Sequence, residues 1–265
     1  MTGKVYLVGA GPGDPELLTL KALRLLHHAD VVLHDELVGG EILGFIRSTA
    51  KLHNVGKRNG NRSTPQAEIH TLLVQYARMG LQVVRLKGGD PLVFGRAGEE
   101  IEALRAAGIE FEIIPGVTSA LGAAASTQIP LTHRELASSF IVLTGHRSST
   151  PDSGWPASIL PGTTVVVYMP GYDYAATSAQ LEARGVNPAT PCAIISRATW
   201  NDQRIYRTTL QDLSSAPQLP SPTLLVVGEV VGLAKRTSQR RETESRLPAI
   251  PDAVLHYPQG QERSE

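Results

Sequence analysis

Short runs of apolar, mostly β-branched residues alternate along the chain with stretches in which apolar residues recur every three or four positions. The runs predict strands, and the wider spacing predicts amphipathic helices. In the segment 15–28, for example, Leu18, Ala22, Leu25 and Leu26 fall on one helical face. Regular alternation of strands and helices is typical of α/β layers built on parallel sheets, which bind ligands at the carboxyl ends of their strands. The pattern therefore predicts an α/β protein.

The alternation runs through both halves of the chain and predicts two α/β domains. Pro115-Gly116 is a turn signal that ends the first domain, and the apolar run 117–125 predicts a connecting helix. We expect domains at 1–115 and 116–234, followed by a polar tail over 235–265 whose lack of apolar spacing predicts disorder. Strands are predicted at 4–8, 30–34, 52–55, 81–86, 111–114, 139–143, 163–168, 191–196, 205–208 and 224–227, and further helices at 15–28, 41–46, 65–79 and 96–107.

A glycine-rich turn links the first strand to the first helix. Glycines at 9, 11 and 13 resemble a turn that brings backbone close to a dinucleotide pyrophosphate. The dinucleotide fingerprint would need glycine at position 14, where this chain has Asp14, and Pro12 and Pro15 remove two backbone N–H groups that a phosphate would use. We therefore expect a ligand without phosphates, with Asp14 as a helix N-cap and Pro15 at the first helical position. A tight turn without a ligand is the alternative.

Two further loops at strand ends carry candidate chemistry. Lys87-Gly88-Gly89-Asp90-Pro91 combines paired glycines, which allow close backbone approach, with a carboxylate that could hold an ammonium group. Gly116-Val117-Thr118-Ser119 opens a helix whose hydroxyl and N–H groups could bind a carboxylate. Together they predict a site for an amino-acid zwitterion, while a plain turn and a simple N-cap are the alternatives. Arg96 and Arg134 add guanidinium groups suited to carboxylates, although such residues are also typical of solvated surfaces.

Composition limits the partners of the chain. It has 25 acidic and 25 basic residues, so no overall charge draws it to nucleic acid or an anionic membrane. No apolar run reaches the ~18 residues of a membrane-spanning helix, and the N-terminus lacks a signal-peptide pattern, so we expect a cytoplasmic protein. The single Cys192 excludes an intrachain disulfide and, among apolar neighbours, is expected to be a buried thiol. The sequence lacks metal-ligand spacings, the G-x-S-x-G nucleophile elbow and the P-loop motif. We therefore expect no bound metal, and we exclude metallohydrolases, serine hydrolases and P-loop proteins.

Six segments together carry a wider pattern: 8–19, 84–91 with its Arg-Leu-Lys-Gly-Gly-Asp-Pro run, 94–100, 114–120, 129–134 and 144–146. In these segments the chain resembles the tetrapyrrole methylase family, in particular its uroporphyrinogen-III C-methyltransferases, over roughly residues 3–233. The resemblance implies S-adenosylmethionine as methyl donor, held in a cleft between two α/β domains of a homodimer. It also implies methylation of two pyrrole carbons of uroporphyrinogen III to give precorrin-2, the precursor of sirohaem and cobalamin. A methylase of a later corrin intermediate is the alternative within the family.

The resemblance also implies a role for individual residues. The family's proton acceptor falls on Asp35 and its proton donor on Lys57, while Arg96, Glu99 and Arg134 match positions that hold or orient the macrocycle. A pyrrole carbon that attacks the methyl group leaves a cationic ring, which must lose a proton, so a carboxylate nearby is a sensible base. A helix cap is the alternative role for Asp35. The implied cofactor-binding residues are Pro12, Gly88, Gly89, Asp90, Val93, Thr118, Ser119, Met169 and Ala198.

Other function classes fit the residues less well. A nicotinamide oxidoreductase would need a phosphate-tolerant glycine at position 14, which this chain lacks. A binding module without catalytic activity would keep the cofactor loops but would not need Asp35, Lys57 and Arg96 together.

Overall fold

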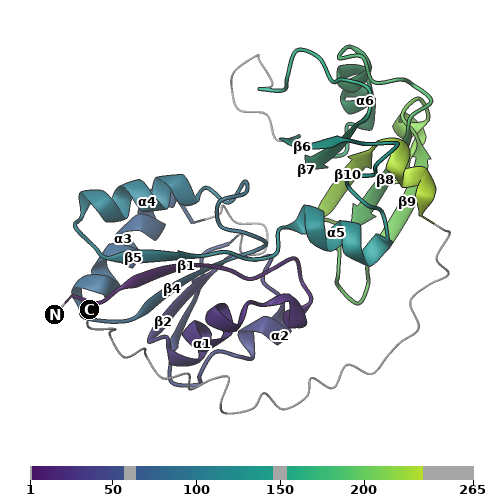
Figure 1. Ribbon diagram of the computed structural model, residues 1–265. Helices are drawn as coiled ribbons and strands as arrows, with labels where there is room; N and C mark the ends of the chain where they lie inside the picture. The colour runs from purple at the N-terminus through teal and green to yellow at the C-terminus, as the bar shows by residue number, and fades with distance from the viewer. Residues whose placement is uncertain (1, 57–63, 146–153, 235–265) are drawn as a thin grey trace, which may run out of the picture. The chain divides into compact units, whose positions relative to one another are not determined.

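The computed structural model describes residues 2–56, 64–145 and 154–234 (Figure 1). The described residues fall into two compact units, which divide between Val117 and Thr118. Each of the ten predicted strands is present within one or two residues of its expected bounds, and the predicted α/β class is confirmed. Lys57 and the predicted tail over 235–265 lie outside the described residues.

The first unit is built on a parallel five-stranded sheet in the order β3-β2-β4-β1-β5. Two helices cover each face of this sheet, as Figure 1 shows: α1 and α2 on one face, α3 and α4 on the other. The strands are β1 (Val5–Gly9), β2 (Val31–His34), β3 (Lys51–Asn54), β4 (Val83–Lys87) and β5 (Phe111–Ile114). The helices are α1 (Leu20–His28), α2 (Gly40–Leu43), α3 (Gln66–Arg78) and α4 (Ala97–Ala106).

Each face of the parallel sheet has its own apolar cluster, because successive side chains of a strand point to opposite faces. On β4, Val84 and Leu86 pack toward the cluster that includes α1 and α2, whereas Val83 packs toward the cluster that includes α3 and α4. All five residues of β4 are buried, although two of them are Arg85 and Lys87. The central strand therefore carries two charged side chains into the interior of the unit.

The first predicted helix is interrupted, which corrects the expected span 15–28. Pro15–Leu17 forms a short 3-10 helix, η1, and α1 begins only at Leu20. The Asp14 side chain accepts a hydrogen bond from the Glu16 N–H at 2.9 Å, so Asp14 is the expected N-cap, but of η1. Thr19 caps α1 by accepting from the Ala22 N–H at 3.1 Å.

The second unit contains a five-stranded sheet in the order β6-β7-β10-β8-β9. Only β6 and β7 pair in parallel, and the remaining pairs are antiparallel, so the expectation of a parallel sheet is wrong here. The seven residues between β8 and β9 are too few for a parallel crossover, which needs about a dozen. The strands are β6 (Ser139–Thr144), β7 (Thr163–Tyr168), β8 (Pro191–Ser196), β9 (Arg204–Thr209) and β10 (Thr223–Val227).

Helices α5 (Ser119–Thr127) and α6 (Tyr174–Glu182) complete the regular elements of the second unit, together with the 3-10 helices η2 (Leu213–Ser215) and η3 (Glu229–Leu233). The predicted connecting helix 117–125 corresponds to α5, whereas α6 was not predicted. Cys192 lies fully buried on β8, which confirms the expected buried thiol. Burial raises the pKa of the Cys192 thiol to about 12. Across the described part of the chain, no helix combines the length and apolar character needed to cross a membrane.

Candidate functional site

Three backbone segments of the first unit meet at the carboxyl ends of β1, β4 and β5. Gly11 and Gly89 bond to each other, with the Gly11 N–H donating to the Gly89 carbonyl at 3.1 Å and the Gly89 N–H donating to the Gly11 carbonyl at 2.7 Å. A Cβ at Gly9 would lie 2.6 Å from the Gly116 Cα and 2.7 Å from the Gly89 oxygen. Gly89 has a left-handed backbone with φ of 67°. The protein backbone itself therefore needs glycine at positions 9 and 89.

Gly88 is different, because the protein itself would accept a Cβ at this position. The atom nearest to a Cβ placed at Gly88 would be the Leu37 Cβ, at 3.4 Å, which is an ordinary contact distance. Gly88 is also half-buried at the end of β4 rather than packed against backbone. The predicted close approach of a ligand to the paired glycines therefore applies to Gly88 more directly than to Gly89.

Asp90 joins the loop after β4 to the segment after β5. Its two carboxylate oxygens accept hydrogen bonds from the Leu92 N–H at 2.8 Å and from the Gly116 N–H at 3.0 Å. The half-buried Val93 donates its N–H to the Asp90 carbonyl at 3.3 Å. Asp90 thus has a structural role that the sequence did not indicate, and the role in holding an ammonium group stays a prediction.

Acidic side chains follow three neighbouring strands of the first unit. Asp35 comes directly after β2, Asp90 follows β4, and Asp14 lies in the turn after β1, beside the half-buried Pro12. The sheet order places β2, β4 and β1 side by side, and parallel strands end at the same edge. Arg85 pairs with the Asp35 carboxylate, so the Asp14 and Asp90 carboxylates are the ones that favour a cationic ligand group over a phosphate at this edge, in agreement with the absence of the dinucleotide fingerprint.

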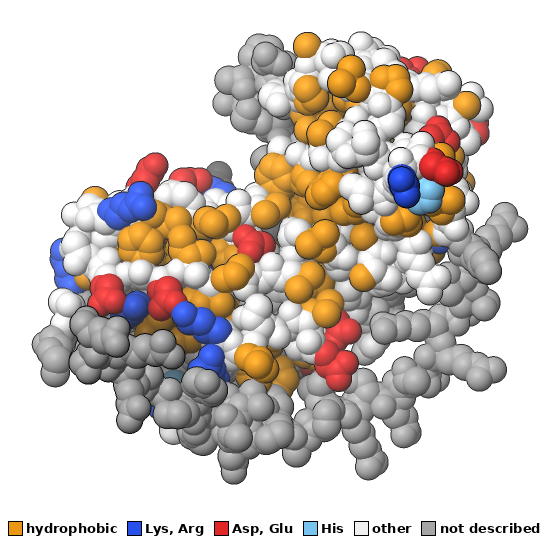
Figure 2. All heavy atoms as spheres, viewed as in Figure 1, with side chains coloured by type: hydrophobic (Ala, Val, Ile, Leu, Met, Phe, Trp, Pro, Cys, Tyr) orange, Lys and Arg blue, Asp and Glu red, His pale blue; other side chains and the backbone are white. Residues whose placement is uncertain are grey.

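Among the described residues of the first unit, several charges away from this edge pair with charges of opposite sign. Figure 2 shows acidic and basic side chains interspersed on the face in view. Lys4 pairs with Glu110 at 2.7 Å, for example, and Glu112 contacts both Lys4 and Lys21. The carboxylates at the strand ends therefore act as a local feature, as expected for a chain with zero formal charge.

Asp35 contacts a buried network of charged side chains formed by Arg85, Lys87 and Glu100. The Arg85 Nε donates to the Glu100 Oε1 at 2.9 Å, and another guanidinium nitrogen of Arg85 donates to the Asp35 Oδ1 at 2.5 Å. The Lys87 Nζ and the Gln66 Nε2 also donate to the Glu100 Oε1, at 3.1 and 3.2 Å. The side chains of Arg85, Lys87 and Glu100 are at most 4% exposed, whereas that of Asp35 is 30% exposed.

The surroundings of these groups perturb their protonation. Burial lowers the pKa of the Lys87 ammonium, and the neighbouring Arg85 lowers it further, against the opposing effect of Glu100. Burial alone would lower the pKa of the Arg85 guanidinium, but the Asp35 and Glu100 carboxylates raise it above its ordinary value. Arg85 is therefore the permanent cation of the network. The second oxygen of Glu100 is buried and has no hydrogen-bond partner among the described residues.

Arg96 and Glu99 form an exposed pair at the start of α4. The Arg96 Nε and a terminal nitrogen donate to the two Glu99 oxygens at 2.8 and 2.7 Å, in a bidentate fork. This hydrogen bonding raises the pKa of Arg96 and lowers that of Glu99. Phe94 and Arg96 both have left-handed backbones, with φ of 53° and 56°, although neither is glycine. Strained backbone of this kind is found at binding and catalytic sites, because the surrounding structure must enforce it.

In the second unit, Tyr168 occupies the N-terminus of α5. Its hydroxyl accepts from the Ala120 N–H at 2.8 Å and lies 2.5 Å from the Thr118 hydroxyl. Thr118 stands at the N-cap position of α5, as the alternative of a simple N-cap expects, but its side chain makes no capping hydrogen bond. The half-buried Ser119 is the first residue of the helix. The Tyr168 hydroxyl thus bonds to hydroxyl and N–H groups at the start of α5, which sequence analysis expected to bind a ligand carboxylate.

Met169 and Ala198 follow β7 and β8, at strand ends, as do the candidate residues of the first unit. Met169 is exposed, with a left-handed φ of 48°, and Ala198 is buried between Arg197 and Thr199, which have φ of 49° and 70°. Arg134 is exposed in the segment between α5 and β6. The predicted site residues are therefore distributed over both units, and Lys57 lies outside the described residues.

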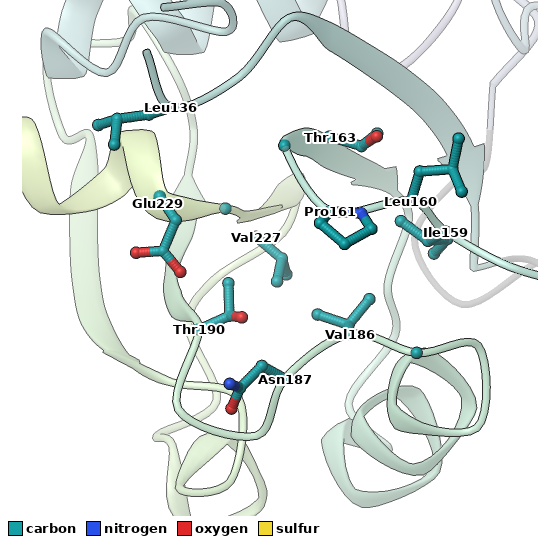
Figure 3. Close-up of a pocket in the computed structure, with 13 residues that line it drawn as sticks. Leu136, Ile159, Leu160, Pro161, Thr163, Val186, Asn187, Thr190, Val227 and Glu229 are labelled. Atoms are coloured by element: carbon teal, nitrogen blue, oxygen red, sulfur yellow. The ribbon is translucent and has the colours of Figure 1, made fainter.

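A cavity of about 420 Å³ lies at the other end of the second sheet (Figure 3). Thr163 begins β7, Thr190 immediately precedes β8 and Val227 ends β10, so all three lie at the end opposite to Met169. Figure 3 shows Leu136 and Glu229 on one side of this cavity and Ile159 and Leu160 on the other. None of its lining residues is a predicted site residue, so the cavity is separate from the candidate site.

Sequence analysis missed Glu100, Arg85 and Tyr168 as contributors. The sequence did contain an indication for Arg85, because a charged residue in the middle of a buried apolar strand needs a partner of opposite charge. Tyr168 ends a strand with a polar tip that had to find a hydrogen bond on burial. The described residues contain no cluster of three or more His, Cys, Asp or Glu side chains that could hold a metal ion.

Comparison with known proteins identifies the family. The family model described as Tetrapyrrole (Corrin/Porphyrin) Methylases matches residues 4–214. Siroheme synthase of Hahella chejuensis is 47% identical over 239 residues, covering 89% of this chain and 51% of the relative. The chain thus spans about half the length of the curated relatives it matches.

Solved structures extend the likeness to the fold. The structure of uroporphyrin-III-C-methyltransferase from Thermus thermophilus is 48% identical, with a TM-score of 0.75, over 88% of this chain and 95% of that one. A T. thermophilus uroporphyrin-III C-methyltransferase complexed with S-adenosylhomocysteine is 40% identical, with a TM-score of 0.74, over 87% and 100% of the two chains. On this evidence the chain belongs to the tetrapyrrole (corrin/porphyrin) methylase family.

Proposed function

We propose that this chain is an S-adenosylmethionine-dependent methyltransferase that methylates two pyrrole carbons of uroporphyrinogen III. The product is precorrin-2, and the siroheme synthases among the relatives favour sirohaem synthesis as its use. The observation that carries the proposal is 48% identity over 95% of a T. thermophilus uroporphyrin-III-C-methyltransferase. The relative complexed with S-adenosylhomocysteine, which is the demethylated product of the donor, supports the choice of cofactor.

The carboxyl edge of the first sheet fits such a cofactor. S-adenosylmethionine carries a sulfonium and an ammonium group but no phosphate. These charges suit an edge with the Asp14 and Asp90 carboxylates and a turn in which Pro12 and Pro15 provide no N–H group for a phosphate. The protein backbone does not itself require glycine at position 88, which is consistent with a ligand lying next to the backbone there. We propose that the cofactor is held by Pro12, Gly88, Gly89, Asp90 and Val93 of the first unit and by Thr118, Ser119, Met169 and Ala198 of the second.

The cofactor supplies an electrophilic methyl group, and the residues of the chain orient the substrate and remove a proton. A pyrrole carbon forms the new C–C bond while the S–CH3 bond breaks and its electron pair stays on sulfur. The resulting ring cation loses a proton, and we propose that Asp35 accepts it. We propose Lys57 as the proton donor of the reaction. Arg96, Glu99 and Arg134 are proposed to hold the macrocycle and its carboxylates.

The decisive experiment is methyl transfer under anaerobic conditions. Purified protein is incubated with uroporphyrinogen III and methyl-labelled S-adenosylmethionine, and the product is analysed by mass spectrometry. We expect a product that carries two added methyl groups. Absence of labelled product, together with methylation of a later precorrin offered in parallel, would replace this substrate with a later corrin intermediate.

Cofactor binding is tested separately by a pair of glycine variants. Gly88→Ala places a methyl group in ordinary contact with the Leu37 Cβ, at 3.4 Å, so we expect the chain to fold. We expect the variant to bind S-adenosylhomocysteine at least tenfold more weakly, a loss of ~1.4 kcal/mol. Gly98→Ala is the matched control, since no atom lies within 4 Å of its added Cβ on the surface of α4. Calorimetric titration of both variants provides the measurement. Wild-type affinity in Gly88→Ala would remove Gly88 from the cofactor site.

We also propose that the chain forms a homodimer, as its resemblance to the family implies. Sedimentation equilibrium of the purified full chain tests this directly. A single species with the mass of one chain, at concentrations used for the activity assay, would contradict it.

A further inference from the structure

We propose that Arg85 and Glu100 are positioning residues that hold the Asp35 carboxylate in place for proton removal. The inference rests on the proposed function, in which Asp35 is the proton acceptor. It is carried by the contacts between these three side chains, which form one continuous chain of ion pairs from the interior to the carboxyl edge of the first sheet.

All three guanidinium nitrogens of Arg85 donate hydrogen bonds. Its Nε donates to Glu100, one terminal nitrogen donates to the Leu33 and Leu86 carbonyls at 3.4 and 3.2 Å, and the other terminal nitrogen donates to Asp35. The guanidinium is planar and rigid, so fixing two of its nitrogens fixes the direction of the third. The position of the Asp35 Oδ1 is therefore determined by the buried part of the network.

Glu100 anchors this arrangement from α4. Its carboxylate is fully buried, and one oxygen accepts from Arg85, Lys87 and Gln66. Removing ionised groups from water is costly, and a well-packed apolar cluster would stabilise the unit as well or better. A buried ion pair that contributes little to stability invites a functional explanation, and its link to Asp35 provides one.

Exposure separates the role of Arg85 from that of Asp35. The Arg85 side chain is 3% exposed and that of Asp35 is 30% exposed, so Asp35 is the member of the network that solvent and ligands can reach. Arg85 cannot reach a substrate carboxylate without leaving its four acceptors. It therefore acts through Asp35, as a positioning residue, and not through contact with the substrate.

The test is a double-mutant cycle between Arg85→Gln and Asp35→Asn. Methyl transfer to uroporphyrinogen III is measured in single turnover with enzyme in excess, so that slow variants remain measurable. A residue that acts only through Asp35 has no further effect once the carboxylate is gone, whereas a residue needed only for folding lowers the rate in both backgrounds. We expect Arg85→Gln to slow transfer at least tenfold in the wild-type background and less than threefold in the Asp35→Asn background.

Three further measurements make the outcome unambiguous. Arg47→Gln is the matched control, because Arg47 also pairs with a carboxylate, Asp30, and a backbone carbonyl, but at the opposite edge of the sheet; we expect its rate to stay within twofold. S-adenosylhomocysteine affinity should stay within threefold in each variant. Glu100→Gln keeps the buried volume and removes the anchoring charge. Combined with Asp35→Asn, it provides a second double-mutant cycle with the same expected result, which can be measured even if Arg85→Gln fails to fold.

Equal losses in both backgrounds, for Arg85→Gln or for Glu100→Gln, would overturn the positioning role. Failure of the proposed function looks different, since the wild-type protein itself would then not methylate uroporphyrinogen III.

Discussion

Replacing Gly9 by alanine should destabilise the first unit by pushing apart the three segments that meet at the carboxyl edge of its sheet. Gly9 is the last residue of β1, and its backbone conformation is open to any residue, so the effect comes from contact and not from φ. The added Cβ would lie 2.6 Å from both the Cα and the nitrogen of Gly116 and 2.7 Å from the Gly89 oxygen. All three are backbone atoms, which cannot rotate away as the end of a side chain can.

The cost follows from the displacement that is needed. An ordinary contact begins at 3.4 Å, so the segments must separate by 3.4 − 2.6 = 0.8 Å. Overpacking of this kind costs about 1–3 kcal/mol. Loss of one of the short bonds nearby, such as that from the Ala10 N–H to the Lys87 carbonyl at 2.8 Å, adds ~1 kcal/mol. We expect a total of about 2–4 kcal/mol, a large part of the ~5–15 kcal/mol by which folded proteins are usually stable.

Hydrogen exchange of the β1 and β4 amides is the appropriate assay, because Trp155 and Trp200 both lie in the second unit and report on that unit. A loss of 2 kcal/mol would accelerate exchange from the opened state about 30-fold. Gly98→Ala is the control and should leave exchange unchanged or slower, since its Cβ meets open space on a helix. Wild-type exchange rates in Gly9→Ala would refute the argument that close backbone packing requires this glycine.

Three other substitutions or treatments test separate parts of the structure. Tyr168→Phe should lower the free energy of unfolding by about 1–3 kcal/mol, measured by denaturant titration, because the Ala120 N–H loses its acceptor. The raised pKa of Cys192, about 12, leaves the native thiol protonated at pH 8, so thiol-specific labelling should proceed only as the second unit opens; rapid labelling of the native protein would contradict this. Arg96→Lys keeps the charge but loses the bidentate fork, so single-turnover methyl transfer should fall at least tenfold while S-adenosylhomocysteine affinity stays within threefold. Normal turnover would remove Arg96 from the substrate site.

The strands were predictable because each is a short apolar run bounded by turn residues. Phe111–Ile114, Thr163–Tyr168 and Pro191–Ser196 were predicted with their observed bounds. Helix α6 was missed because its sequence, Tyr-Ala-Ala-Thr-Ser-Ala-Gln-Leu-Glu, has little apolar periodicity. Its start is instead set by Asp173, whose side chain accepts from the Ala176 N–H at 2.9 Å. Tertiary packing of Tyr174 and Leu181 into the core then holds a helix that its pattern alone does not specify.

The antiparallel pairing of the second sheet could have been inferred from connection lengths, since β8 and β9 are only seven residues apart. The interruption between η1 and α1 was harder to foresee. Leu18 falls on the apolar face of the expected helix, but Leu18 and Thr19 both have extended backbones, and the Thr19 cap restarts the helix. A capping residue inside an apolar pattern therefore marked a boundary that periodicity did not.

The buried network shows how far sequence reasoning can reach within a site. Arg85 and Lys87 alternate on β4 with Val84 and Leu86, so strand geometry alone places both cations on one face of the sheet. In the structure this is the face that α4 covers. On α4 the buried positions 97, 100, 101 and 104 follow helical spacing, and this pattern puts Glu100 inside while Glu99 stays exposed beside Arg96. A pair of inward cations and one inward carboxylate thus predicts a buried ion pair.

The link from that ion pair to Asp35 needs the fold. Asp35 directly follows β2, fifty residues before Arg85 in the chain, and the two side chains meet only because the sheet order places β2 next to β4. The register pairs Leu33 of β2 with Arg85, so the carbonyl of Leu33 and the side chain of Asp35 both face the same guanidinium. Strand order depends on how all the helices pack against the sheet, which no local pattern encodes. A positioning contact between neighbouring strands is therefore the kind of functional feature that emerges only once the whole unit is assembled.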